Sequence, residues 1–144
     1  MKRVLVTGAT GFLGRHCLAR LSDELCEIHA VSRNVQALEV NPIQWHSADL
    51  RDPAAAGQLI AVIRPTHLLH LAWEATPRVY SGSPENLRWL EAGTAMLAAF
   101  GQAGGQRFVG AGTSAEYEAG DEPCAEDLAL IRPATIYGKC KAAC

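Results

Sequence analysis

The side chains with the clearest chemical potential in this sequence are a tyrosine and a lysine near its last residue, Tyr137 and Lys141. If the segment is helical, their spacing of four residues puts them on one face. A free tyrosine has a pKa of about 10 and is a poor base at neutral pH. A nearby ammonium group favours the phenolate and lowers that value, so the pair could pass a proton to or from a substrate hydroxyl. The alternative interpretation is an ordinary surface pair on a helix.

Near the N-terminus, three glycines form a second pattern with chemical meaning. Gly8, Gly11 and Gly14 follow a short β-branched run and precede a segment of helical spacing. This is the context that a dinucleotide-binding turn requires. Gly8 allows a tight turn, Gly11 lets the backbone approach a pyrophosphate, and Gly14 lets the helix pack close to the strand. The anion would lie at the helix N-terminus, where free N–H groups favour it. The alternative is a glycine turn without a ligand.

The rest of the chain alternates between short apolar runs and segments of helical periodicity. The runs predict strands at Arg3–Thr7, Glu27–Ser32, Ile43–Ala48, His67–Ala72 and Arg107–Ala111. The periodic segments predict helices over Leu13–Leu25, Pro53–Ile63 and Pro84–Ala103, and a last helix that begins near Arg132-Pro133 after a loop over 113–131. Strand, helix and strand joined by short links predict parallel pairing. We therefore expect one domain over residues 1–144, with a doubly wound α/β sheet of the Rossmann type in three layers.

Composition excludes several classes of function. The 144 residues carry a formal charge of −2 and lack the basic excess or basic stripe that is typical of nucleic-acid-binding proteins. The longest apolar runs are five or six residues, whereas a membrane span needs about 20. The apolar stretch after Lys2-Arg3 is too short for a secretory signal. We expect a soluble, cytoplasmic protein that binds neither nucleic acid nor membrane.

The cysteines and histidines show no metal-binding spacing. The five cysteines are odd in number and contain no C-x-x-C pair. Cys140 and Cys144 would share a helix face, but no further ligand lies nearby in the sequence. His67 and His70 flank a short apolar run, and we interpret them as strand-end residues. We expect reduced thiols and no metal site.

Taken in order along the chain, these motifs resemble the short-chain dehydrogenase/reductase superfamily, especially its extended branch of nucleotide-sugar epimerases, dehydratases and reductases. The resemblance covers the chain from Lys2 to Cys144. Besides the glycine turn, it rests on Asp49-Leu50 after the third strand, on Leu71-Ala72 at the end of the fourth, on Thr113 four residues before Tyr117, and on the Y-x-x-x-K spacing of Tyr137 and Lys141.

The resemblance implies a bound nicotinamide dinucleotide. The glycine turn would hold its pyrophosphate, with Phe12 and Leu13 at the helix N-terminus. Asp49, with Leu50 beside it, would face the adenine amino group. The chain at Leu71-Ala72 would pass behind the cofactor.

The same resemblance implies a division of chemical roles. Tyr137 would transfer a proton to or from a sugar hydroxyl while hydride moves to or from the nicotinamide. Lys141 would hold the nicotinamide ribose as well as lower the tyrosine pKa. Thr113 would bind the substrate oxygen and orient it. Ser114 is adjacent and is the alternative hydroxyl.

The end of the second strand bears on the choice of cofactor. Enzymes of this fold that use NAD usually place a carboxylate there, against the adenosine ribose. Here the sequence reads Val31-Ser32-Arg33-Asn34, and no acid occurs until Glu39. The Arg33 guanidinium suits a 2′-phosphate, so NADP is favoured and NAD is the alternative. Arg33 could also be an ordinary surface arginine.

The residues after Thr113 bear on the type of reaction. The dehydratases of this family carry an Asp-Glu pair directly after the catalytic Thr, whereas this chain has Ser114-Ala115. An epimerase or a keto-reductase acting on a nucleotide-sugar therefore fits better. Trp73, Asn86 and Trp89 could help to close a sugar site, or could serve core or lid packing.

Two departures from the family pattern bear on function. Tyr117 is followed by Glu118 and not by glycine, and the chain ends three residues after Lys141. The extended branch continues for about as many residues again, so we expect a truncated form without the C-terminal substrate lobe. Arg107–Ala111 would then be an exposed sheet edge, through which a homodimer could form. The alternative function is a non-catalytic dinucleotide-binding module that binds a protein partner, but the intact Tyr137 and Lys141 favour an enzyme.

Overall fold

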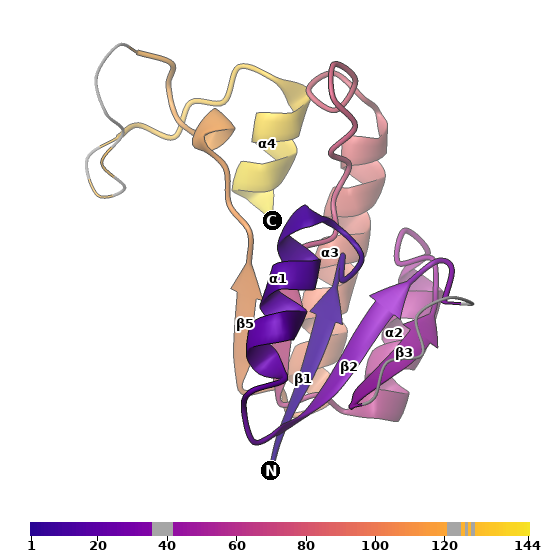
Figure 1. Ribbon diagram of the computed structural model, residues 1–144. Helices are drawn as coiled ribbons and strands as arrows, with labels where there is room; N and C mark the ends of the chain where they lie inside the picture. Colours follow the sequence, from indigo (N-terminus) through magenta and orange to yellow (C-terminus); the bar gives the residue numbers. More distant parts are fainter. Residues whose placement is uncertain (36–41, 121–124, 126, 128) are drawn as a thin grey trace.

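One parallel sheet, with the strand order β3-β2-β1-β4-β5, organises the computed structural model (Figure 1). The structure describes residues 1–35, 42–120, 125, 127 and 129–144. The strands are β1 (Lys2–Thr7), β2 (Cys26–Ser32), β3 (Ile43–Ser47), β4 (His67–His70) and β5 (Arg107–Gly110). The helices are α1 (Phe12–Leu21), α2 (Pro53–Ile63), α3 (Glu85–Gln102) and α4 (Ile136–Ala143), with a 3-10 turn η1 (Ser114–Glu116). The doubly wound Rossmann-type sheet expected from the sequence is confirmed.

The order of the strands fixes where a ligand can bind. From β1 the chain winds outward through β2 to β3, then crosses back to β4 on the other side of β1 and continues to β5. The direction of winding therefore reverses between β1 and β4. In open sheets of this kind, ligands bind beyond the carboxyl ends of the strands at such a switch point.

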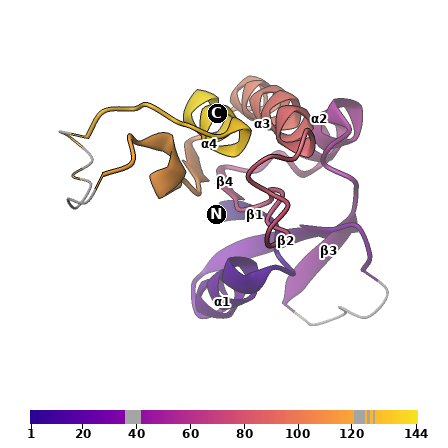
Figure 2. The same cartoon turned by 90° about the horizontal axis from the view of Figure 1, so that it is seen from above.

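The helices cover the two faces of the sheet separately, which gives the expected three layers. Figure 2 shows α1 on one face, and α2 and α3 on the other with α4 beside α3. The alternation of side chains along β1 supplies both cores: Val6 packs with Leu18 of α1, and Leu5 packs with α2 and α3. None of the described helices has the length and apolar character that would let it cross a membrane.

Local signals account for the ends of the long helices. Asp52 caps α2 because its carboxylate accepts a hydrogen bond from the Ala54 amide at 2.9 Å, and Pro53 takes the first helical position. α3 ends before Gly104, which adopts a positive φ of 84°. The Gly105 amide then donates to the Phe100 carbonyl at 2.9 Å and closes the last turn.

Several predicted boundaries were wrong, for identifiable reasons. The last helix begins at Ile136 and not near Arg132-Pro133, because Thr135 is extended and its hydroxyl caps the helix by accepting from the Gly138 amide at 3.0 Å. β4 ends at His70, two residues early, because the Leu71 and Ala72 amides turn to the Thr7 hydroxyl. The first helix ends at Leu21 and not at Leu25, and β3 ends one residue before Ala48.

Candidate active site

A cavity of about 710 Å³ opens beyond the carboxyl ends of the strands, at the switch point. Every residue predicted to bind the cofactor lines it: Gly8, Gly11, Phe12, Leu13, Gly14, Arg33, Asp49, Leu50, Leu71 and Ala72. These residues come from the ends of four strands and the start of α1. The structure therefore brings residues far apart in the sequence to one cavity.

The turn from β1 into α1 leaves no room for side chains at two of its glycines. Gly8 has a φ of +64°, and a Cβ there would lie 2.7 Å from the Ala72 nitrogen. A Cβ at Gly14 would overlap the Gly8 carbonyl oxygen and Ala9. The tight turn and the close helix packing assigned to these two glycines are thus present in the structure.

The N-terminus of α1 is open to an anion. Its N-cap is Gly11, which offers no side-chain cap, and the first turn contains no acidic residue. The Phe12 ring turns outward and packs under the Arg15 guanidinium, 5.1 Å from the ring centroid. The first amides of the helix consequently lie at the cavity with the favourable end of the helix dipole behind them.

A hydrogen-bonded seam between β1 and β4 forms the back of the cavity. The Thr7 hydroxyl oxygen accepts from the amides of Leu71 and Ala72, both at 3.2 Å, and lies 2.8 Å from His70 Nδ1. The two amides and the imidazole nitrogen thus all lie within hydrogen-bond distance of this one oxygen. Burial lowers the pKa of His70 to about 4, so this histidine is neutral. The seam fixes Leu71 and Ala72 against Gly8.

Asp49 is held at the cavity by a neighbouring arginine that sequence reasoning did not identify. The Arg51 guanidinium donates to both carboxylate oxygens of Asp49, from Nε at 3.0 Å and from Nη2 at 2.6 Å. These bonds lower the pKa of Asp49 to about 2. Arg51 also bonds Glu85 at the start of α3, at 3.0 Å. The sequence did contain one signal for this contact, an arginine two residues after the aspartate. At that separation a guanidinium can reach both oxygens of the carboxylate.

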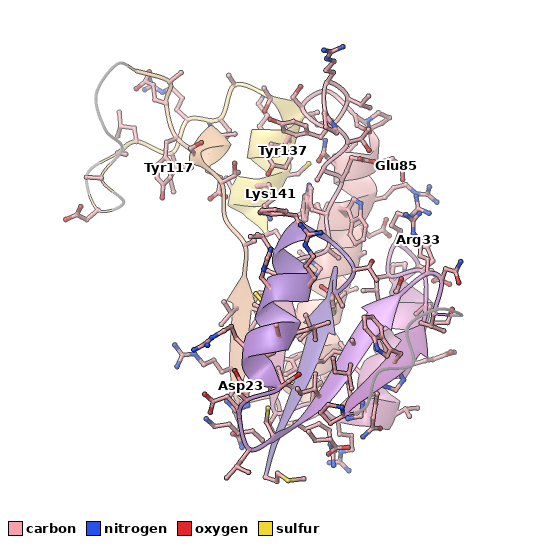
Figure 3. The ribbon with its side chains drawn as sticks, viewed as in Figure 1. Asp23, Arg33, Glu85, Tyr117, Tyr137 and Lys141 are labelled. Atoms are coloured by element: carbon pink, nitrogen blue, oxygen red, sulfur yellow. The ribbon has the colours of Figure 1, made fainter. Side chains whose placement is uncertain are left out.

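Arg33 is an exposed residue that lines the cavity directly after β2, at the end of the strand next to β3 (Figure 3). Its carbonyl accepts from the Ser47 hydroxyl at 3.3 Å, which ties the ends of β2 and β3 together. Among the residues described, no carboxylate forms an ion pair with its guanidinium. Glu39, the next acid in the sequence, lies outside the described residues.

The proposed proton-transfer pair lies on α4, at the same edge of the sheet (Figure 3). Tyr137 and Lys141 are both half-buried. The Tyr137 ring meets the Tyr80 ring edge to face at 4.8 Å, and its amide donates to the Ser81 carbonyl at 3.2 Å. The Lys141 ammonium lies over the Trp73 ring, 4.2 Å from its centroid. Burial lowers the pKa of Lys141, against a smaller opposing effect of Cys144 and Glu116.

Thr113 opens the turn η1, which packs against α4. Its hydroxyl accepts from the Ala115 amide at 3.3 Å, and its own amide donates to the Glu116 carboxylate at 2.8 Å. Gly138 of α4 approaches the Ala115 carbonyl so closely that no Cβ would fit between them. The structure thus brings this turn to the helix that carries Tyr137. Neither Thr113, Tyr137 nor Lys141 lines the cavity itself.

Comparison with known proteins agrees with this geometry. Residues 4–144 match the model of the NAD dependent epimerase/dehydratase family. The chain belongs to that family.

Solved structures of similar fold include several epimerases. A UDP-glucose 4-epimerase of Thermus thermophilus, in complex with NAD, is 29% identical with a TM-score of 0.81 over 98% of this chain and 48% of that one. A UDP-galactose 4-epimerase is 27% identical with a TM-score of 0.82, over 98% and 48% of the two chains. A UDP-glucose 4-epimerase of Thermotoga maritima, with UDP-glucose, shares the fold at 19% identity and a TM-score of 0.79, over 96% and 47%. The chain spans about half the length of these structures.

Three residues whose roles the sequence analysis left open, Trp73, Asn86 and Trp89, lie together beside the cavity and are joined by ring stacking and a hydrogen bond. Trp73 and Trp89 line the cavity, and their rings stack with centroids 6.3 Å apart. Asn86 is fully buried and accepts the Trp73 indole N–H at 2.8 Å. Trp73 and Trp89 thus line the cavity and Asn86 is a core residue, while a role in closing a sugar site stays a prediction.

Metal ligands do not gather in the described part of this family member. No group of three His, Cys, Asp or Glu side chains there could hold a metal ion. The four described cysteines, Cys17, Cys26, Cys140 and Cys144, are free thiols. His67 and His70 are the first and last residues of β4, as expected.

Proposed function

We propose that this chain carries the dinucleotide-binding and proton-transfer part of an NAD(P)-dependent enzyme that acts on a nucleotide-sugar. The observation that carries the proposal is the cavity at the switch point, in which a glycine cradle, an open helix N-terminus and a clamped aspartate meet. The nucleotide-sugar substrate is suggested by the family and by the UDP-sugar epimerases of similar fold.

The residues of the cavity fit such a cofactor. The amides at the start of α1 would bind the pyrophosphate, which can approach because Gly8 and Gly14 carry no side chain. Asp49 would accept a hydrogen bond from the adenine amino group, since Arg51 holds its carboxylate ionised and in place. When bound, the nicotinamide would supply hydride transfer.

The side chains of this chain would manage the proton and the substrate oxygen. Tyr137 would exchange its phenolic proton with a sugar hydroxyl. Lys141 has a half-buried ammonium that forms no ion pair among the described residues, so it would favour the phenolate and bind ribose hydroxyls. The Thr113 oxygen accepts one backbone amide and keeps its hydrogen to donate to the substrate oxygen.

An epimerase or a keto-reductase is favoured over a dehydratase. Elimination of water requires an acid and a base beside the sugar, and Ser114-Ala115 supply neither. The nearest carboxylate, Glu116, is occupied by the Thr113 amide in a capping box. The Glu116 carboxylate therefore stabilises the turn η1.

NADP is the favoured cofactor, because Arg33 lies at the rim where an adenosine ribose would be. Calorimetric titration of the 144-residue chain should show saturable binding, tighter for NADPH than for NADH. Arg33→Ala should remove most of that difference, a loss of about 1–3 kcal/mol for a charge-assisted contact. Arg15→Ala is the matched control and should preserve the preference. Equal affinities in the parent would contradict the preference, and no binding by a folded chain would contradict the proposed function.

A further inference from the structure

The Lys141 ammonium lies against an aromatic ring, while Cys144 and Glu116 act on it electrostatically. Its Nζ lies 4.2 Å from the centroid of Trp73, well inside the range of about 6 Å for a cation–π contact. No hydrogen bond or ion pair within the described ranges joins this side chain to another one. The ammonium therefore rests on the ring with N–H groups left to donate.

The Trp73 ring is itself rigidly held. Its indole N–H donates to Asn86 Oδ1 at 2.8 Å, and its face stacks on Trp89 with an interplanar angle of 26°. Asn86 in turn is 0% exposed, and its amide nitrogen donates to the carbonyls of Tyr80 and Ser83 at 2.6 and 2.8 Å. Every polar atom of the Asn86 side chain is thus satisfied, which fixes the indole in one orientation.

The position of Trp73 links the lysine to the cavity. Trp73 follows Leu71-Ala72, which the Thr7 seam fixes at the back of the cavity, and its side chain lines the cavity wall. Lys141 does not line the cavity but touches this wall residue. The indole is therefore the structural connection between the dinucleotide cavity and α4.

We propose that Trp73 is a positioning residue, which holds the Lys141 ammonium at the nicotinamide-ribose end of the cavity. This inference rests on the proposed function, in which Lys141 binds that ribose. The effect of Trp73 on binding is limited to that end of the cofactor. The adenosine and pyrophosphate parts are bound without Trp73, by Asp49, Arg33 and the start of α1.

A double-mutant cycle on cofactor affinity tests the proposal, with Trp73→Leu, Lys141→Met and the pair combined. Trp73→Leu should weaken NADPH binding about fivefold to thirtyfold, the scale of a partly buried cation–π contact. In the Lys141→Met background the same change should have less than a twofold effect, because the indole acts through the ammonium. ADP, which lacks the nicotinamide ribose, should bind all variants equally.

Matched variants separate this role from a structural one. Trp89→Leu removes the stacking partner but leaves the Trp73 indole bonded to Asn86 and in contact with the ammonium, so it should weaken NADPH binding less than Trp73→Leu does. Trp73→Phe keeps a ring face, so its NADPH affinity should lie between that of the parent and that of Trp73→Leu. The phenylalanine variant replaces Trp73→Leu in the test if the leucine variant does not fold. Multiplicative effects of Trp73→Leu and Lys141→Met, weaker ADP binding in Trp73→Leu, or tighter NADPH binding in Trp73→Leu would each overturn the inference. If the parent binds no NADPH, the proposed function fails instead.

Discussion

The cavity and the α4 region differ in how their residues are held. Around the cavity, backbone packing at Gly8 and Gly14 positions the turn, the Thr7 hydroxyl fixes two amides, and the Arg51 side chain holds Asp49. At α4, Gly138 packs against the Ala115 backbone, but the two candidate catalytic side chains are held by aromatic rings of other segments, Tyr80 on Tyr137 and Trp73 under Lys141. The proposed cofactor-binding part is thus built into the strand ends, whereas the proposed proton-transfer part depends on packing between separate segments.

This difference implies that binding and chemistry can be separated by mutation. Changes on α4 should impair turnover or nicotinamide contacts and spare the adenosine end. Changes in the β1–α1 turn should impair every part of cofactor binding.

A change at Tyr137 is expected to separate turnover from cofactor affinity most strongly. Tyr137→Phe keeps the ring contact with Tyr80 and loses the exchangeable proton, so cofactor affinity should change less than twofold. Under the proposed function, turnover of a UDP-sugar should fall by about 100-fold to 10,000-fold, the scale of general acid–base catalysis. Tyr80→Phe is the control, because it keeps the ring pair and removes the neighbouring hydroxyl. Parental turnover in Tyr137→Phe would show that Tyr137 is not the proton donor.

A second test, with a smaller expected effect, makes the same change in each region. It uses two glycines that are packed against backbone, one at the cavity and one on α4. Gly14→Ala should push α1 off the turn, and Gly138→Ala should push α4 off η1. Each should lower the free energy of unfolding by about 1–3 kcal/mol, measured by urea denaturation. Only Gly14→Ala should weaken ADP binding. Gly57→Ala, in α2 with open space around its Cβ, controls for the added methyl group. Loss of ADP binding in Gly138→Ala would show that the two regions are not independent.

The same contrast explains what the sequence could and could not reveal. The cavity residues belong to short motifs at strand ends, and parallel strands bring those ends together whatever the side chains between them. The Arg51 bond to Glu85 and the Trp73 contact with Lys141 join residues 34 and 68 positions apart, respectively. Such contacts depend on side-chain directions set by packing, which no local pattern encodes. The late start of α4 has a local cause, the Thr135 cap, which competed with a proline signal at Pro133.

The central claim is that the cavity binds a nicotinamide dinucleotide with its nicotinamide ribose toward Trp73 and Lys141. The most direct measurement is ¹H–¹⁵N NMR of the 144-residue chain, titrated with NADPH and separately with ADP. Both ligands should shift the amides of Gly11, Phe12 and Leu13, whereas NADPH alone should shift the indole N–H of Trp73. Shifts confined to the separate groove around Leu21 and Val109, or an indole N–H of Trp73 that responds equally to ADP, would contradict the account.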